Sequence, residues 1–267
     1  MLNNIVKRIS DFSSAITGEK RSNVVWIASY PRSGNKWFRC MLGYLMSNGQ
    51  FLMSSNNSIN EIIPNIHLQV SKSHLRKDFA PIKTHFLPNH PISLSYKAQK
   101  AIYIVRNPGD IIASSYKFLQ RQGKIPLDET GEELIDSAKF QDFAADFIEQ
   151  QGYSDWEKDF GTWTSSVNQW LSGGLPYEVY PVQFSLLSHK PEQVLKGVAN
   201  FLELDIPEFL FGESVQKNSI SESRKREPNN KGIGLGVSGY GFQQLSQANK
   251  EKFLENFGTL LKRIEQG

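Results

Sequence analysis

The chain has 267 residues, and its 30 Lys and Arg against 27 Asp and Glu give a formal net charge of +3. This length suits one large domain or two small ones, and 39% hydrophobic residues exclude a disordered chain. The nearly balanced charge does not predict nucleic-acid binding, so any anion site must be local. The single cysteine, Cys40, excludes an internal disulfide and a zinc site made of cysteines. We expect it to be a small buried side chain.

The sequence carries no sign of membrane insertion. No stretch reaches the roughly 18 apolar residues of a membrane-spanning helix. Residues 1–20 lack the continuous apolar core of a secretory signal. We therefore expect a cytoplasmic protein with no stable membrane insertion.

Short β-rich apolar runs alternate with helical patterns along the chain. Strands are predicted at 23–29, 80–86, 100–107 and 177–184, and helices at 35–48, 108–120, 160–173, 190–204 and 243–264. Apolar strands separated by helices indicate a parallel sheet that is covered on both faces. The simplest interpretation is a single three-layer α/β/α domain over 1–267, with a helical insertion at about 121–160.

Residues 217–242 contain five Gly and the consecutive cations Arg224, Lys225 and Arg226, with little periodicity. A loop of this length inside a domain is usually functional or disordered. We expect it to act as a lid over a binding site. The alternative is a solvated basic loop.

The stretch Ser29–Phe38, SYPRSGNKWF, directly follows the first predicted strand. Backbone N–H groups of such a loop and of the following first helical turn form an anion site together with the helix dipole. Gly34 lets the backbone approach a phosphate closely, while Arg32 and Ser33 offer a charge and a hydroxyl. The stretch resembles a P-loop, but Trp37 stands where a Walker A sequence has its magnesium-binding Ser or Thr. Taken alone, it is also compatible with an ordinary strand-to-helix turn.

Four stretches together resemble the motifs of the sulfotransferase family. SYPRSGNKW is similar to the family's 5′-phosphosulfate loop, and RNPGDIIASSYKF at 106–118 to its 3′-phosphate motif. IKTHFLP at 82–88 is similar to the K-T-H-x-x-P segment, and FGTWTSSVNQW at 160–170 to the G-S-W-x-x-x-V-x-x-W helix. The matches occur in the family's order and cover about residues 23–204.

The resemblance implies a P-loop-NTPase-like fold and a chemistry. The enzyme would transfer the sulfuryl group of 3′-phosphoadenosine 5′-phosphosulfate (PAPS) to a hydroxyl or amine of a small molecule or glycan, without a metal. Arg106 and Ser114 match the 3′-phosphate ligands. His85 is the expected general base, and Lys83, on the same face of the strand, is expected to stabilise developing charge together with Arg32. The 5′ site falls on consecutive residues: Arg32, Ser33, Gly34, Asn35, Lys36 and Trp37.

The sequence departs from the family pattern in three places. Lys36 stands where a Thr is usual, so a cation replaces a hydroxyl. VQFSLL at 182–187 stands where many members have R-Y-E-D-L. The C-terminal R-K-G-x-x-G-D-W motif survives only in fragments, for which the candidates are Arg224 with Lys225, and Lys231 with Gly232.

Alternatives from other classes stay open at this stage. One is a P-loop kinase that uses ATP and magnesium, and the other is a non-catalytic nucleotide-binding module. We expect the acceptor to lie against the segments around 50–80 and 140–170. Their neighbouring aromatic residues suit a phenol or another apolar alcohol unless they belong to the core: Phe51, Phe118, Phe147, Tyr153, Trp156 and Phe160. The remaining histidines are interpreted as surface or structural residues: His67, His74, His90 and His189.

Overall fold

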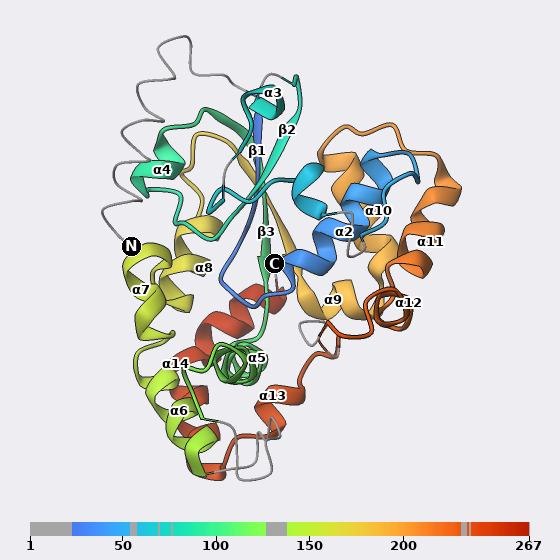
Figure 1. The fold of residues 1–267 in the computed structure, drawn as a ribbon. Coiled ribbons are helices and arrows are strands. Elements are labelled where there is room, and N and C mark those ends of the chain that lie inside the picture. The colour runs from blue at the N-terminus through green and yellow to red at the C-terminus, as the bar shows by residue number, and fades with distance from the viewer. Residues whose placement is uncertain are drawn as a thin grey trace.

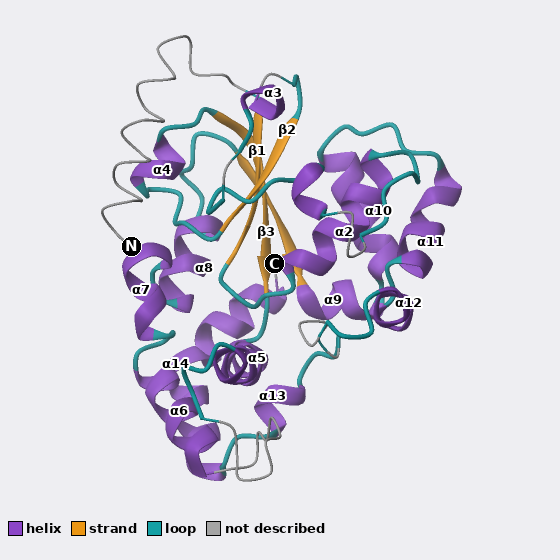
Figure 2. Cartoon of the chain, viewed as in Figure 1, coloured by secondary structure: helices purple, strands orange, loops and turns teal. Residues whose placement is uncertain are grey.

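The structure, a computed structural model, describes residues 23–53, 58–68, 70–75, 77–126, 138–230, 234 and 236–266. Within them lies one parallel sheet with the strand order β2-β1-β3-β4. Its strands are β1 (Val24–Ser29), β2 (Ala80–Thr84), β3 (Ala98–Val105) and β4 (Glu178–Gln183). All four strands were predicted from their apolar runs. Because they are parallel, their carboxyl ends meet at one edge of the sheet, as Figure 2 shows.

Helices cover both faces of the sheet, and β1 is therefore buried on both sides. Val24, Trp26 and Ala28 belong to one apolar cluster, and Val25 and Ile27 belong to the other. The first cluster includes side chains from α5 (Pro108–Arg121), α6 (Ala138–Glu149), α8 (Trp163–Leu171) and α14 (Gln247–Gln266). The second includes α2 (Asn35–Met46), α9 (Phe184–His189), α10 (Pro191–Phe201) and α11 (Glu208–Lys217). Figure 1 shows these two groups on opposite sides of the strands, which confirms the three-layer α/β/α fold.

Shorter helices complete the described chain. They are η1 (Ile59–Glu61), α3 (Lys72–Leu75), α4 (Pro91–Leu94), α7 (Ser154–Phe160), α12 (Ile220–Arg226) and α13 (Tyr240–Gln243). The described part of the predicted insertion at 121–160 thus contains α6 and α7. No helix among the described residues combines the length and apolar character that crossing a membrane requires.

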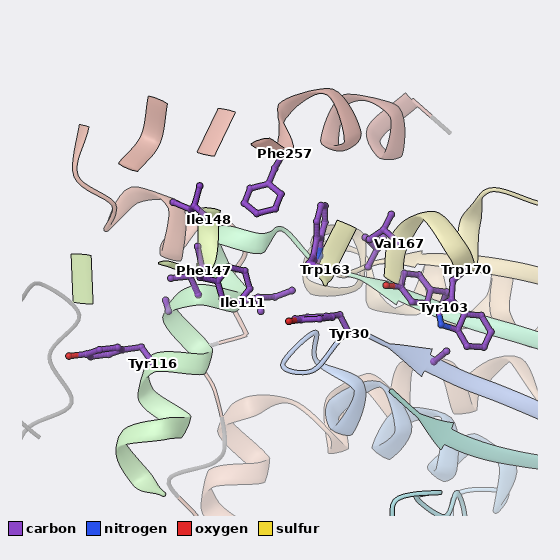
Figure 3. Packing of buried hydrophobic residues seen from close by; sticks show 14 of the residues in the cluster. Tyr30, Tyr103, Ile111, Tyr116, Phe147, Ile148, Trp163, Val167, Trp170 and Phe257 are labelled. Carbon is purple, nitrogen blue, oxygen red and sulfur yellow. The ribbon is translucent and has the colours of Figure 1, made fainter. Parts of the chain in front are cut away.

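A cluster of buried aromatic residues connects the sheet to the site edge. Trp163, Val167 and Trp170 lie on one side of α8 and are buried, as their helical spacing predicted (Figure 3). The Trp163 indole N–H donates to the backbone oxygen of Arg106 at 3.1 Å, and the Tyr103 and Ser166 hydroxyls pair at 2.9 Å. These two hydrogen bonds satisfy polar groups in the core, and the first of them holds the end of β3 in place.

The segment 217–242 is more helical than the sequence indicated. Residues of α12 and α13 fall inside it, so the expectation of an irregular loop was wrong for these parts. The Ser219 hydroxyl caps α12 by accepting the Glu222 N–H at 3.3 Å, and Lys225 pairs with Glu222 at 2.6 Å. Helices this short carry too few residues to show a 3.6-residue period.

Candidate active site

The candidate site lies where the four strands end. The loop 30–34 follows β1, His85 follows β2 by one residue, Arg106 follows β3 and Phe184 follows β4. Side chains from all four positions line one cavity of about 780 Å³. In open parallel sheets, ligands bind at the carboxyl ends of the strands, next to a strand whose two neighbours in the sheet are reached by connections that run in opposite directions. Here that strand is β1, which lies between β2 and β3.

Backbone geometry explains the composition of the loop after β1. Gly34 has φ +89°, and a Cβ there would lie 2.4 Å from a ring carbon of Phe184. Only glycine meets both demands. The Asn35 side chain points back into the fold, where its Nδ2 donates to the Ile27 oxygen at 3.1 Å and the Ser29 hydroxyl at 3.2 Å. Its amide therefore anchors the loop to β1, and its backbone remains the part available to a phosphate.

The two predicted phosphate motifs meet through Arg32. Its Nε donates to the Ser114 hydroxyl at 3.1 Å, and its backbone oxygen accepts Arg106 Nη1 at 3.1 Å. The Arg106 guanidinium lies 4.2 Å above the centroid of the Phe184 ring. Burial, together with the nearby charges of Arg121 and Arg106, lowers the pKa of Arg32 to about 10. Clustered cations of this kind favour a polyanionic ligand.

The other residues of the predicted 5′ site take different places. Lys36 is exposed and lines the cavity, as does the partly buried Trp37. The Trp37 indole donates to the Asn218 oxygen at 2.9 Å. Ser33 is buried, does not line the cavity, and its hydroxyl has no hydrogen-bond partner within the described chain. Lys36 is thus placed as a point charge at the cavity wall.

His85 and Lys83 also line the cavity. His85 Nδ1 lies 2.7 Å from the Ser29 backbone oxygen, so this nitrogen carries the proton and Nε2 presents a lone pair. Burial, aided by the charges of Lys83 and His67, lowers the pKa of His85 well below its ordinary value of 6.5. Lys83 is 7% exposed, and burial lowers its pKa as well. A neutral imidazole beside a buried amine suits proton transfer from a hydroxyl.

His67 supports this site as a structural residue, one of the two roles expected for it, although its contact with His85 was not predicted. Its Nε2 accepts the His85 backbone N–H at 3.1 Å, and the two rings stack with centroids 5.5 Å apart. Burial lowers the pKa of His67 to about 2. Residues 65 and 83 pair in an isolated parallel bridge, which brings the two histidines together. No spacing in the sequence signals a contact between residues 18 positions apart.

Asp110, a lining residue, holds the C-terminal segment at the cavity through its carboxylate. Its carboxylate accepts the Gly239 N–H at 2.9 Å and the Gly241 N–H at 2.8 Å. Arg106 Nη2 also donates to the Val237 oxygen at 3.4 Å. Residues 234, 236, 237, 240 and 241 therefore line the same cavity as the anion loop.

Two of the predicted C-terminal basic residues lie near this lining without forming part of it, and Arg224 Nη2 donates to the backbone oxygen of Gly234, a lining residue, at 3.4 Å. Arg224 and Lys225 are exposed and lie outside the set of lining residues, because α12 turns Ser223 and Glu227 toward the cavity instead. Lys225 is paired with Glu222. Lys231 and Gly232 lie outside the described residues.

Phe184 is a lining residue that the sequence did not single out. Its ring packs on Gly34 and lies beneath the Arg106 guanidinium, and its position as the last residue of a predicted strand was a usable signal. None of the six aromatic residues proposed for an acceptor surface lines the described cavity. Phe147 is core, and Phe160 packs against His85 and His67 with ring centroids 5.7 and 5.1 Å apart.

Comparisons with known proteins agree with this architecture. Residues 22–255 match the family model for the sulfotransferase domain. The chain is 25% identical over 262 residues to sulfotransferase 1 family member D1 of Mus musculus, covering 90% of this chain and 83% of that protein. It is 29% identical over 201 residues to flavonol 3-sulfotransferase of Flaveria bidentis, covering 70% of this chain and 58% of that protein.

Solved structures share the fold. Mouse sulfotransferase SULT7A1 complexed with PAP aligns with a TM-score of 0.65 at 19% identity, covering 96% of this chain and 91% of that one. Retinol dehydratase in complex with androsterone and the inactive cofactor PAP aligns with a TM-score of 0.62 at 13% identity, covering 91% and 81%.

Proposed function

The chain belongs to the sulfotransferase family, and from this premise we propose that it transfers the sulfuryl group of PAPS to a hydroxyl of a small-molecule or glycan acceptor, with His85 as general base. The observation that carries the proposal is the shared cavity. One wall holds Arg32, Arg106 and Ser114, and another holds Lys83 with an imidazole whose Nδ1 is fixed by the Ser29 oxygen.

The residues present fit the nucleotide. The cavity of about 780 Å³ is large enough for a nucleotide-sized ligand. Several of the described residues that line the cavity are cations, and the acidic ones among them are Asp110 and Glu227. The buried Arg106 Nε has no hydrogen-bond partner within the described chain, so it is a donor that an oxyanion can satisfy.

Each residue has a defined role in the proposed reaction. His85 Nε2 takes the proton from the acceptor hydroxyl, whose oxygen forms the new bond to sulfur. The bond between sulfur and the bridging phosphate oxygen breaks, and its electron pair stays on the departing 3′,5′-bisphosphate. Lys83 and Arg32 stabilise the charge that develops on the transferring and leaving oxygens. The loop from Ser33 to Trp37 positions the 5′-phosphate through backbone N–H groups.

Replacement of the base tests this mechanism. His85→Ala removes the proton acceptor and should lower kcat by about 10²–10⁴-fold, measured as sulfate transfer from PAPS over a panel of phenols and alcohols. The rise in Tm caused by the bisphosphate product should persist, because the phosphate ligands remain. Turnover close to wild type would remove His85 from the mechanism.

The sequence motif and the family match both favour this reaction over ATP-dependent phosphoryl transfer. Trp37 occupies the position where a Walker A sequence holds magnesium through Ser or Thr. A thermal shift with adenosine 3′,5′-bisphosphate, compared with ATP plus magnesium, separates the two. Stronger stabilisation by ATP plus magnesium would favour the kinase.

The segment 217–242 is proposed to act as a lid. Asp110 ties Gly239 and Gly241 to the first turn of α5, so the segment is anchored on the same element as Ser114. A nucleotide bound between them should slow proteolysis within 217–242. Unchanged cleavage on adding the bisphosphate would contradict the lid.

A further inference from the structure

Apart from Lys36 and Lys117, the lysines and arginines that line the cavity fall into two groups. Arg32, Arg106 and Arg121 lie on the phosphate side, where Arg106 donates to the Arg32 backbone and both neighbours depress the pKa of Arg32. Arg39 and Lys83 lie on the base side, where the charge of Arg39 depresses the pKa values of Lys83 and His85. The proposed nucleotide role accounts for the first group. The nucleotide role gives no function to Arg39.

Arg39 is a buried cation that has no counter-charge among the described residues. It is 5% exposed, yet it lines the cavity. Its Nη2 donates to the Asn60 side-chain oxygen at 3.0 Å, and its Nε has no hydrogen-bond partner within the described chain. Burial lowers its pKa to about 10. A guanidinium taken out of water without a partner costs several kcal/mol, and an incoming anion offsets that cost.

Lys83 is likewise a buried side chain that lines the cavity. No carboxylate of the described residues lies within ion-pair distance of either cation. The acidic groups of the lining are engaged elsewhere: Asp110 accepts two backbone N–H groups, and Glu227 accepts the Asn230 amide at 2.6 Å. Among the residues that the structure describes, the base end of the cavity is therefore positive and has no anion paired with Arg39 or Lys83.

The neighbours of Arg39 come from outside the nucleotide motifs. Asn60 belongs to η1, and Asn65 pairs with Lys83 in the isolated bridge. Both asparagines line the cavity. Their segment therefore reaches the base end beside Lys83 and His85, where the acceptor hydroxyl must lie in the proposed reaction.

We propose that the acceptor carries an oxyanion, a carboxylate or a sulfonate-type group, on the same small molecule as its reacting hydroxyl, and that Arg39 and Lys83 bind this group with help from Asn60. This inference rests on the proposed sulfuryl transfer and names its substrate class. Arg39 is then a specificity-determining residue. An acidic acceptor would enter a preformed positive pocket, whereas a neutral acceptor would leave Arg39 buried and unpaired.

Matched acceptors test the proposal at saturating PAPS. One arm compares 4-hydroxybenzoate with 4-hydroxybenzamide, and the other compares 4-hydroxybenzenesulfonate with its sulfonamide. We expect the wild type to prefer each anion in kcat/KM by about 10–100-fold, the usual worth of a charge-assisted hydrogen bond. Arg39→Met should collapse that ratio, and Arg39→Lys should keep part of it. The arm with the larger ratio identifies the preferred oxyanion.

Other outcomes distinguish a failure of the acidic-acceptor inference from a failure of the proposed sulfuryl transfer. A ratio near one, or a ratio that survives Arg39→Met, overturns the acidic-acceptor inference and leaves sulfuryl transfer intact. An Arg39→Met variant that loses PAPS affinity with an unchanged ratio assigns Arg39 to the nucleotide instead. If no probe is turned over, calorimetry on the bisphosphate-loaded protein decides. Tighter binding of the anions, lost in Arg39→Met, supports the inference, and equal or absent binding overturns it.

Discussion

Acidification should destabilise this protein partly through His67. The folded chain holds the pKa of His67 at about 2 through burial, whereas its ordinary value is 6.5. Below the ordinary value the unfolded chain binds a proton that the folded chain refuses, so stability falls as pH falls. Above the pKa of the unfolded chain, His67 is neutral in both states, so its full share of the stability is present and is lost as the pH falls below that value. Linkage gives a loss of about 1.4 kcal/mol from this one residue between about pH 7.5 and about pH 5.5.

Urea unfolding of wild type and His67→Gln over that pH range isolates the effect. Glutamine can still accept the His85 N–H but does not titrate, so the stability of the variant should fall by about 1.4 kcal/mol less than that of wild type. Lost ring packing lowers stability equally at every pH and leaves the difference in slope untouched. His189→Gln, at an exposed position, is the matched control and should follow wild type. Parallel pH profiles for His67→Gln and wild type would refute the reasoning.

Two further predictions concern the phosphate side. Arg106→Ala removes a guanidinium at the end of β3 and should weaken PAPS binding by about 10–100-fold in calorimetry, with a smaller loss for adenosine 5′-phosphosulfate, which lacks the 3′-phosphate. Equal losses would contradict the 3′ assignment. Gly34→Ala forces a side chain into φ +89° and onto Phe184 at 2.4 Å. It should cost about 2–4 kcal/mol in urea unfolding and reduce the bisphosphate-induced rise in Tm, and wild-type values would argue against the close contact.

Much of the architecture follows from local sequence. The strands were predictable because each is a short apolar run, and the parallel sheet because helical patterns separate them. The helix after Arg106 was predictable because Pro108 suits its first turn. The anion loop, Arg106, Ser114, Lys83 and His85 all lie within one motif length of a strand end. For that reason the sequence by itself identified them and their family.

Tertiary structure decided the contacts between distant segments. His67 meets His85 only because residue 65 pairs with residue 83 beside β2. Arg39 becomes an unpaired charge only because folding buries it against Asn60. Arg224 and Lys225, which matched a basic motif, turn to solvent because a short capped helix sets their direction. A linear pattern records spacing within one element, whereas burial and counter-charge depend on which elements pack together, and the tertiary structure alone determines them.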